Sequence, residues 1–162
     1  MSAIHEGGCL CGDLRYALSE KPMRLTWCSC QFCQRMTGAP MNALAGFQGA
    51  AFKVMSGAPR VFTHVSEGSG KELYLNSCPN CATTVFIELE RFPGFVGVMT
   101  GTLDDPNWFE RSPENSKYIF TSSAQKGTLV QAGFPVFEEH ASTLDGSAIT
   151  PVVYDEHCLV RG

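Results

Sequence analysis

The stretch that decides the fold is Cys28-Ser29-Cys30-Gln31-Phe32-Cys33-Gln34-Arg35, which places three thiols within six residues. A thiolate is a soft ligand, and three of them crowded onto a short loop favour Zn²⁺ over hard cations. Four ligands close a tetrahedral zinc site, whereas three leave one corner open for water or substrate. The remaining cysteines therefore decide whether the three-cysteine site, Cys28, Cys30 and Cys33, lacks a ligand.

Two further cysteine pairs flank this stretch, Cys9-Leu10-Cys11 and Cys78-Pro79-Asn80-Cys81. A C-x-x-C turn that contains proline is typical of a zinc knuckle. Neither pair can supply four ligands alone, but the two pairs together can. We therefore group them as one closed structural zinc site, the four-cysteine site. It would join the first strand to the central hairpin across nearly 70 residues, which removes chain entropy from the unfolded state.

Composition sets the class of protein and its expected compartment. A chain of 162 residues with 44% hydrophobic and 17% charged residues fits one domain, which we expect over residues 1–162. The net charge of −4 without a Lys/Arg run argues against a nucleic-acid partner and gives no support to a membrane one. No signal peptide and no apolar run of about 18 residues is present, so we expect the cytoplasm. In that reducing compartment eight cysteines favour ligands or catalysts over disulfides.

Short alternating segments separated by glycine and proline turns predict a mainly β fold. The expected strands cover residues 14–18, 61–65, 71–76, 83–90, 95–100, 118–121 and 148–154, and one or two further strands are expected within 40–55. The second and third of these form a hairpin that leads to Cys78. Residues 31–37 predict a short helical turn closed by Gly38, and residues 107–111 a second one.

The residues leave several alternatives open. The clustered cysteines could pair as disulfides, although Cys9 and Cys11 are too close to pair comfortably. The three-cysteine site could be a second structural zinc site closed by a fourth ligand, with His64, His157 and Cys158 as the candidates. Phe32 is either core or the side chain that lines a pocket, and Arg35 either anchors a substrate carboxylate or is a solvated surface arginine.

The order of these motifs resembles the glutathione-dependent formaldehyde-activating enzymes, a family grouped with the centromere protein V domain. The resemblance covers about residues 7–137 and leaves 138–162 as a C-terminal extension. Its motifs match residues 8–16, 28–38, 78–86, 101–105 and 134–137 of this chain. Ala82 stands where the family usually has glycine. The family's histidine is absent before Ile119-Phe120, and its later tryptophan is absent from residues 125–131.

The resemblance implies a zinc-knuckled, mainly antiparallel β-sheet sandwich related to methionine sulfoxide reductase B, with the same division of cysteines into four and three. It also implies carbon–sulfur lyase chemistry, in which glutathione, as co-substrate, joins formaldehyde to give S-hydroxymethylglutathione. One zinc would be structural. The other, at the catalytic Cys28, Cys30 and Cys33, would be labile or catalytic and lie beside the bound glutathione. Phe32 and Arg35 are expected beside that thiol from their position and chemistry alone, not from the resemblance.

Two other functions stay open for the sequence. The first is a non-catalytic, zinc-dependent binding module in which the three-cysteine site holds a partner or a second structural metal. The second is a redox enzyme like methionine sulfoxide reductase, which needs a nucleophilic cysteine, and Cys158 is the only cysteine left to supply one.

Overall fold

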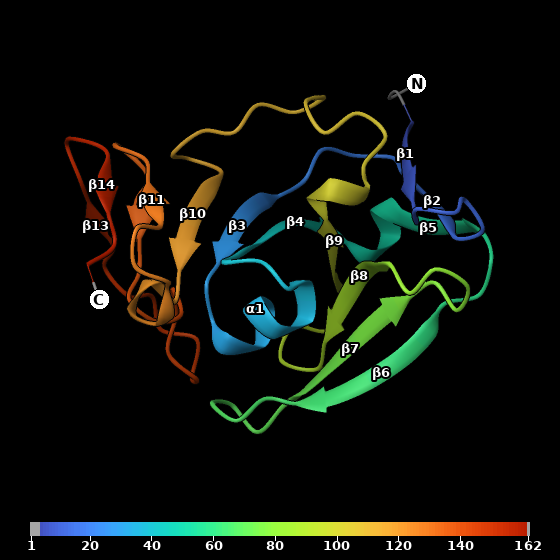
Figure 1. Ribbon diagram of the computed structural model, residues 1–162, viewed down its shortest axis with the longest axis horizontal. Helices are drawn as coiled ribbons and strands as arrows, with labels where there is room; N and C mark the ends of the chain where they lie inside the picture. The colour runs from blue at the N-terminus through green and yellow to red at the C-terminus, as the bar shows by residue number, and fades with distance from the viewer. Residues whose placement is uncertain (1–3, 162) are drawn as a thin grey trace. The chain divides into compact units, whose positions relative to one another are not determined.

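The computed structural model describes residues 4–161 (Figure 1). The chain separates into two compact units. Unit 1 comprises residues 1–24 and 45–110, and unit 2 comprises residues 25–44 and 111–162. The expectation of one domain over 1–162 stays a prediction, and its outermost residues, 1–3 and 162, lie outside the described part of the chain. All the cysteines of each predicted site belong to one unit, so the geometry of each site can be described within that unit.

Unit 1 contains two antiparallel sheets. The first has the order β1 (His5–Gly8), β2 (Arg15–Leu18) and β5 (Phe52–Ser56). The second is a meander of β9, β8, β7 and β6. The bounds of its strands are β6 Arg60–Val65, β7 Glu72–Ser77, β8 Thr84–Leu89 and β9 Phe95–Met99. Two 3₁₀ turns complete unit 1: η1 (Gly49–Ala51) directly precedes β5, and η2 (Thr100–Thr102) directly follows β9.

Alternating apolar side chains fix the first sheet against the core of unit 1. Leu14, Tyr16 and Leu18 are each at most 1% exposed, whereas Arg15 and Ala17 between them are half-buried. This is the period-two pattern of a strand with one buried face. The Tyr16 hydroxyl reaches the Thr102 hydroxyl at 3.0 Å, which attaches β2 to η2.

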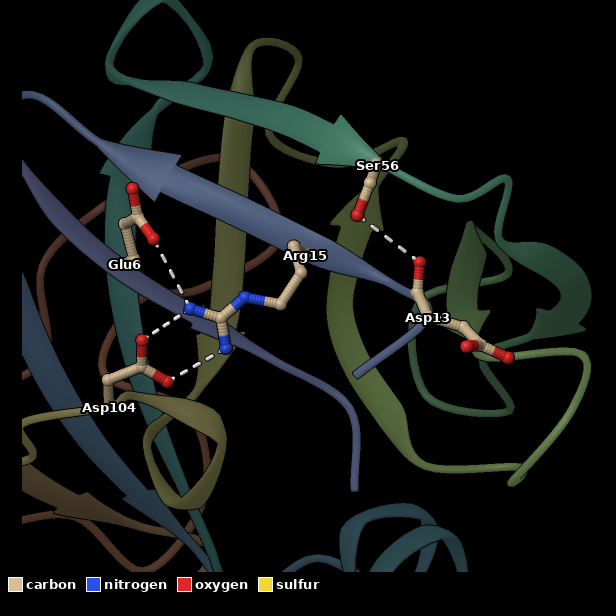
Figure 2. Close-up of polar contacts among 5 residues, drawn as sticks. All are labelled: Glu6, Asp13, Arg15, Ser56 and Asp104. Carbon is tan, nitrogen blue, oxygen red and sulfur yellow. Dashed lines mark hydrogen bonds and ion pairs between the residues drawn. The ribbon is translucent and has the colours of Figure 1, made fainter. Parts of the chain in front are cut away.

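Arg15 adds a charged clamp on the outer side of the same strand, shown in Figure 2. Its guanidinium donates to both carboxylate oxygens of Asp104 and to Glu6 at 3.3 Å. In the same view the Ser56 hydroxyl donates to the Asp13 carbonyl at 3.3 Å. These contacts hold the turn from Cys9 to Asp13, which carries two of the cysteines, at both of its ends.

Unit 2 holds the single α-helix among the described residues, α1 (Gln31–Thr37), directly after β3 (Arg24–Cys28). Strand β10 (Ser116–Ile119) pairs in parallel with β3 and with β12 (Pro135–Val136), and β12 pairs with β13 (Val152–Val153). A separate ribbon joins β11 (Leu129–Val130) to β14 (Cys158–Leu159). Between β10 and β11 lies η3 (Thr121–Ser123), and the chain passes from unit 2 into unit 1 within β4 (Asn42–Gln48).

The mainly β fold class is confirmed, and so is the helical turn over residues 31–37. That helix ends at Gly38, whose φ of 68° is the left-handed conformation that glycine adopts without strain. The helical turn expected at 107–111 is wrong, because these residues form turns and bends. The Asp105 carboxylate accepts the Asn107 N–H at 2.9 Å and so competes with helix formation. The strand expected at 148–154 shrinks to the two residues of β13, and the kinship with methionine sulfoxide reductase B stays a prediction.

Candidate metal centres

The four-cysteine site brings together the two pairs that the sequence grouped. The sulfurs of Cys9, Cys11, Cys78 and Cys81 all lie within 4.8 Å of one another, and all four thiols are free. Cys11 Sγ lies 3.5 Å from Cys9 Sγ and 3.7 Å from Cys78 Sγ. Tetrahedral zinc with Zn–S bonds of about 2.3 Å requires sulfurs about 3.8 Å apart, whereas a disulfide requires about 2.05 Å. The arrangement therefore fits zinc and contradicts the disulfide alternative.

Both loops that carry these sulfurs are closed by hydrogen bonds from backbone N–H groups. The Leu14 N–H donates to Cys9 Sγ at 3.2 Å. In the knuckle, the Cys78 N–H donates to the Thr83 carbonyl at 2.9 Å, and the Ala82 N–H donates to the Cys78 carbonyl at 2.9 Å. Ala82 closes the knuckle at φ 60°, a left-handed conformation that disfavours a side chain. The glycine that the resemblance expects at this position therefore has a geometric reason.

The three-cysteine site is built where β3 ends and α1 begins. Cys28 is the last residue of β3, Cys30 is the N-cap of α1, and Cys33 lies in the first turn. The Cys33 N–H donates to Cys30 Sγ at 3.4 Å. The three sulfurs lie within 4.8 Å of one another, so they can share one metal ion with a ligand position left over.

Comparison with known families now places the chain. The family model of the glutathione-dependent formaldehyde-activating enzyme matches residues 4–123. The chain belongs to this family. A crystal structure of a Rhodobacter sphaeroides protein is similar at 19% sequence identity, covering 61% of this chain and 87% of that one, with a TM-score of 0.49. A comparison with curated proteins finds no match.

Each site buries two of its sulfurs in this member of the formaldehyde-activating family. Cys28 and Cys33 are each 7% exposed and Cys30 is half-buried, while in the four-cysteine site Cys9 and Cys78 are buried, Cys81 is half-buried and Cys11 is exposed. The expectation of an open, solvent-facing three-cysteine site therefore applies to Cys30 alone among its sulfurs. Apolar side chains surround this site: Phe32, Met36, Ile119, Phe120 and Phe137.

Phe32 and Arg35, the two side chains expected beside a bound thiol, differ in their surroundings. Phe32 is half-buried and packs against the cluster that contains Cys28 and Cys33, as a wall of the site would. Arg35 lies exposed in the last turn of α1, where its positive charge interacts favourably with the helix dipole. The position of Arg35 fits either of the two roles that the sequence left open.

The three candidates for a fourth ligand do not join the three-cysteine site. Among residues 4–161 its metal-ligand group contains Cys28, Cys30 and Cys33 only. His157 Nδ1 accepts the Ala132 N–H at 2.9 Å, and Cys158 packs in another cluster of unit 2. His64 belongs to β6 of unit 1.

Hydrogen bonds within each site shift the pKa values of its thiols. In the three-cysteine site, hydrogen bonds from the Cys28 and Cys33 thiols lower the pKa of Cys30 to about 3. Hydrogen bonds with the Cys28 and Cys30 thiols, together with burial, raise the pKa of Cys33. In the four-cysteine site, a hydrogen bond from the Thr83 hydroxyl, aided by backbone N–H groups, lowers the pKa of Cys81 to about 5. These shifts favour the thiolate form at Cys30 and at Cys81, and metal binding would displace protons from the other thiols.

Sequence reasoning missed the amide side chains that surround the sulfurs. Asn80 Nδ2 lies 3.5 Å from Cys11 Sγ and donates to the Asp13 carboxylate at 2.8 Å. Beside the three-cysteine site, Gln34 Nε2 donates to the carbonyls of Ser29 and Ser123 at 2.6 and 2.9 Å and does not contact a sulfur. The spacing of residues in a metal motif does not reveal such an amide contact, because the partners of the amide come from distant turns.

No helix of residues 4–161 is long and apolar enough to span a membrane.

Proposed function

We propose that this protein is a zinc-dependent carbon–sulfur lyase that makes or breaks the bond between the sulfur of glutathione and the carbonyl carbon of a small aldehyde. One observation supports the proposal above all: a member of the formaldehyde-activating family pairs a complete four-sulfur cage with a three-sulfur site that lacks a fourth ligand. The complete cage supports the fold, and the incomplete one leaves a position for a substrate thiol.

The reaction is an addition to a carbonyl group. The thiol sulfur attacks the carbonyl carbon, a C–S bond forms as the C=O double bond opens to an alkoxide, and the thiol proton ends on the new hydroxyl. The reverse reaction returns the proton to the sulfur and releases the aldehyde. A zinc ion bound by Cys28, Cys30 and Cys33 would supply a lower pKa for a thiol at its open position.

The chain's own residues bind and orient the substrate in this proposal. The half-buried Cys30 marks the side from which a thiol reaches the site, because Cys28 and Cys33 are covered. Phe32 excludes water from one wall. Arg35 offers a guanidinium to a glutathione carboxylate, since a planar guanidinium binds carboxylates in a bidentate manner.

The test is the exchange rate between formaldehyde, glutathione and their adduct, measured by NMR exchange spectroscopy on the zinc-loaded protein. We expect wild type to accelerate exchange, Cys30→Ser to lose the acceleration, and Cys158→Ser to keep it. Absence of acceleration by a wild-type protein that carries two zinc ions would refute the lyase proposal. A Cys158→Ser variant that loses turnover, especially of a sulfoxide substrate, would favour the redox enzyme instead.

A second candidate function is a binding module with two structural metals, and the burial of Cys28 and Cys33 favours it. The variant Cys30→Ala separates the two functions. If folding collapses as metal is lost, the three-cysteine site is structural. If the fold survives and thiol binding disappears, the three-cysteine site binds the substrate thiol.

A further inference from the structure

The peptide between the first two sulfurs of the three-cysteine site is held from both sides. Ser29, which joins Cys28 to Cys30, is 2% exposed. Its N–H donates to the Ile119 carbonyl at 3.1 Å, which extends the pairing of β3 with β10 by one residue. Its carbonyl accepts from Gln34 Nε2 at 2.6 Å. The directions in which Cys28 and Cys30 project therefore depend on a backbone carbonyl on one side and on one side-chain amide on the other.

Gln34 uses its whole amide in this task. Its second Nε2 hydrogen bond goes to the Ser123 carbonyl at 2.9 Å, and its Oε1 accepts from Gln125 Nε2 at 3.1 Å. One amide thus joins the loop between two sulfurs, α1 and η3. A glutamate in its place would bring an acceptor against two carbonyl oxygens, and a leucine would leave both carbonyls without the donor.

The far end of this network is itself fixed. The backbone N–H groups of Phe120, Thr121 and Ser122 donate to the carbonyls of residues 139, 137 and 138 at 3.0 to 3.2 Å. Phe120 takes φ 57°, a left-handed conformation that a phenylalanine keeps only where its surroundings impose it. Gln34 therefore connects the three-cysteine site to a rigid segment rather than to a loose loop.

We propose that Gln34 is a positioning residue that presets the three sulfurs for a metal ion. Ligands already held in place need less ordering when the metal binds. Losing the amide should therefore lower the affinity of the three-cysteine site for its metal ion and leave the fold intact. This inference rests on the proposed function only in taking Cys28, Cys30 and Cys33 as a metal site. Groups of this kind around metal ligands are typically worth about 10- to 100-fold in metal affinity.

The experiment titrates the full chain with zinc against a competing chromophoric chelator and compares wild type with Gln34→Leu and Gln34→Glu. The four-cysteine site serves as an internal reference in every sample. We expect the first zinc to bind as in wild type and the second to bind about 10- to 100-fold more weakly, with an unchanged circular dichroism spectrum. Gln31→Leu is the matched control, because Gln31 is exposed on the same helix and should leave both affinities unchanged. Gln125→Leu removes only the hydrogen bond to Gln34 Oε1, so it should lower the affinity for the second zinc ion less than the Gln34 variants do.

Three results would overturn the inference. The second zinc could bind both Gln34 variants as tightly as wild type, which would leave the lyase proposal intact. Both zinc ions and the folded spectrum could be lost together in the Gln34 variants while Gln125→Leu behaves as wild type, which would show that Gln34 supports the fold. Wild type could bind a single zinc, which would remove the metal site and the lyase proposal with it.

Discussion

Replacing Ala82 by glycine should stabilise the protein, although the change removes a methyl group. Ala82 closes the zinc knuckle at φ 60°. A left-handed conformation costs an L-residue roughly 1–2 kcal/mol, and glycine does not bear this cost. Against the gain stands the greater freedom of glycine in the unfolded chain, about 0.4–1 kcal/mol. Ala82 is exposed, so little packing is lost with its methyl group. The net expectation is a gain of about 1 kcal/mol in the free energy of unfolding.

The measurement is thermal unfolding of the zinc-loaded protein by calorimetry at one fixed free zinc concentration, because bound metal shifts the apparent stability. For a chain of this size a gain of about 1 kcal/mol raises the Tm by roughly 2–4 °C. Ala50→Gly is the matched control, since Ala50 is exposed in η1 without a positive φ and should lose stability from the same replacement. If Ala82→Gly lowers the Tm as Ala50→Gly does, the reasoning from backbone strain is refuted.

Three further predictions concern unit 1. Cys78→Ser, which removes a fully buried ligand, should cost the structural zinc and, with it, several kcal/mol of stability, measured by metal analysis and urea unfolding; a variant that keeps its zinc contradicts the grouping of four. Asn80→Ala should lower the zinc affinity of the four-cysteine site about tenfold in a chelator competition, because it removes the amide beside Cys11 Sγ. Equal affinities of variant and wild type would show that Asn80 does not support this site. The Arg15 guanidinium, chiefly through its hydrogen bonds, holds the pKa of the Asp104 carboxyl below its ordinary 3.8. The stability from this half-exposed pair, below about 1 kcal/mol, is therefore fully present at pH 7 and is lost only as pH falls below about 4. The difference in unfolding free energy between wild type and Asp104→Asn should therefore stay nearly constant from pH 7 to about pH 5 and shrink as pH falls from about 4 to about 2. A difference that grows toward acid would contradict the sign.

The sequence was most informative where local rules govern. Cysteine spacing predicted both sulfur clusters, because metal ligands must come in tight local groups. The helix at 31–37 follows from Gly38, a residue that ends helices without strain. Alternation predicted β6 and β7 as a hairpin, and the two strands pair along their full length.

The sequence was least informative where long-range pairing decides. Strand β1 reads His-Glu-Gly-Gly, which has no β propensity of its own and is a strand because β2 lies beside it. The parallel pairing of β10 with β3 and β12 joins segments far apart in the chain, and β11 and β14 are two residues each. Gln34 and Asn80 reach the sulfur clusters through contacts that no spacing rule encodes.

The burial of the sulfurs has a practical consequence for chemical labelling. An alkylating reagent added to metal-free protein can reach the exposed Cys11 of the four-cysteine site and the half-buried Cys30 of the three-cysteine site, whereas Cys28 and Cys33 are covered. Inactivation by such a reagent would then not tell damage to the scaffold from modification of the reactive centre. Peptide mapping of the alkylated positions has to accompany any inhibitor study that aims to count essential thiols.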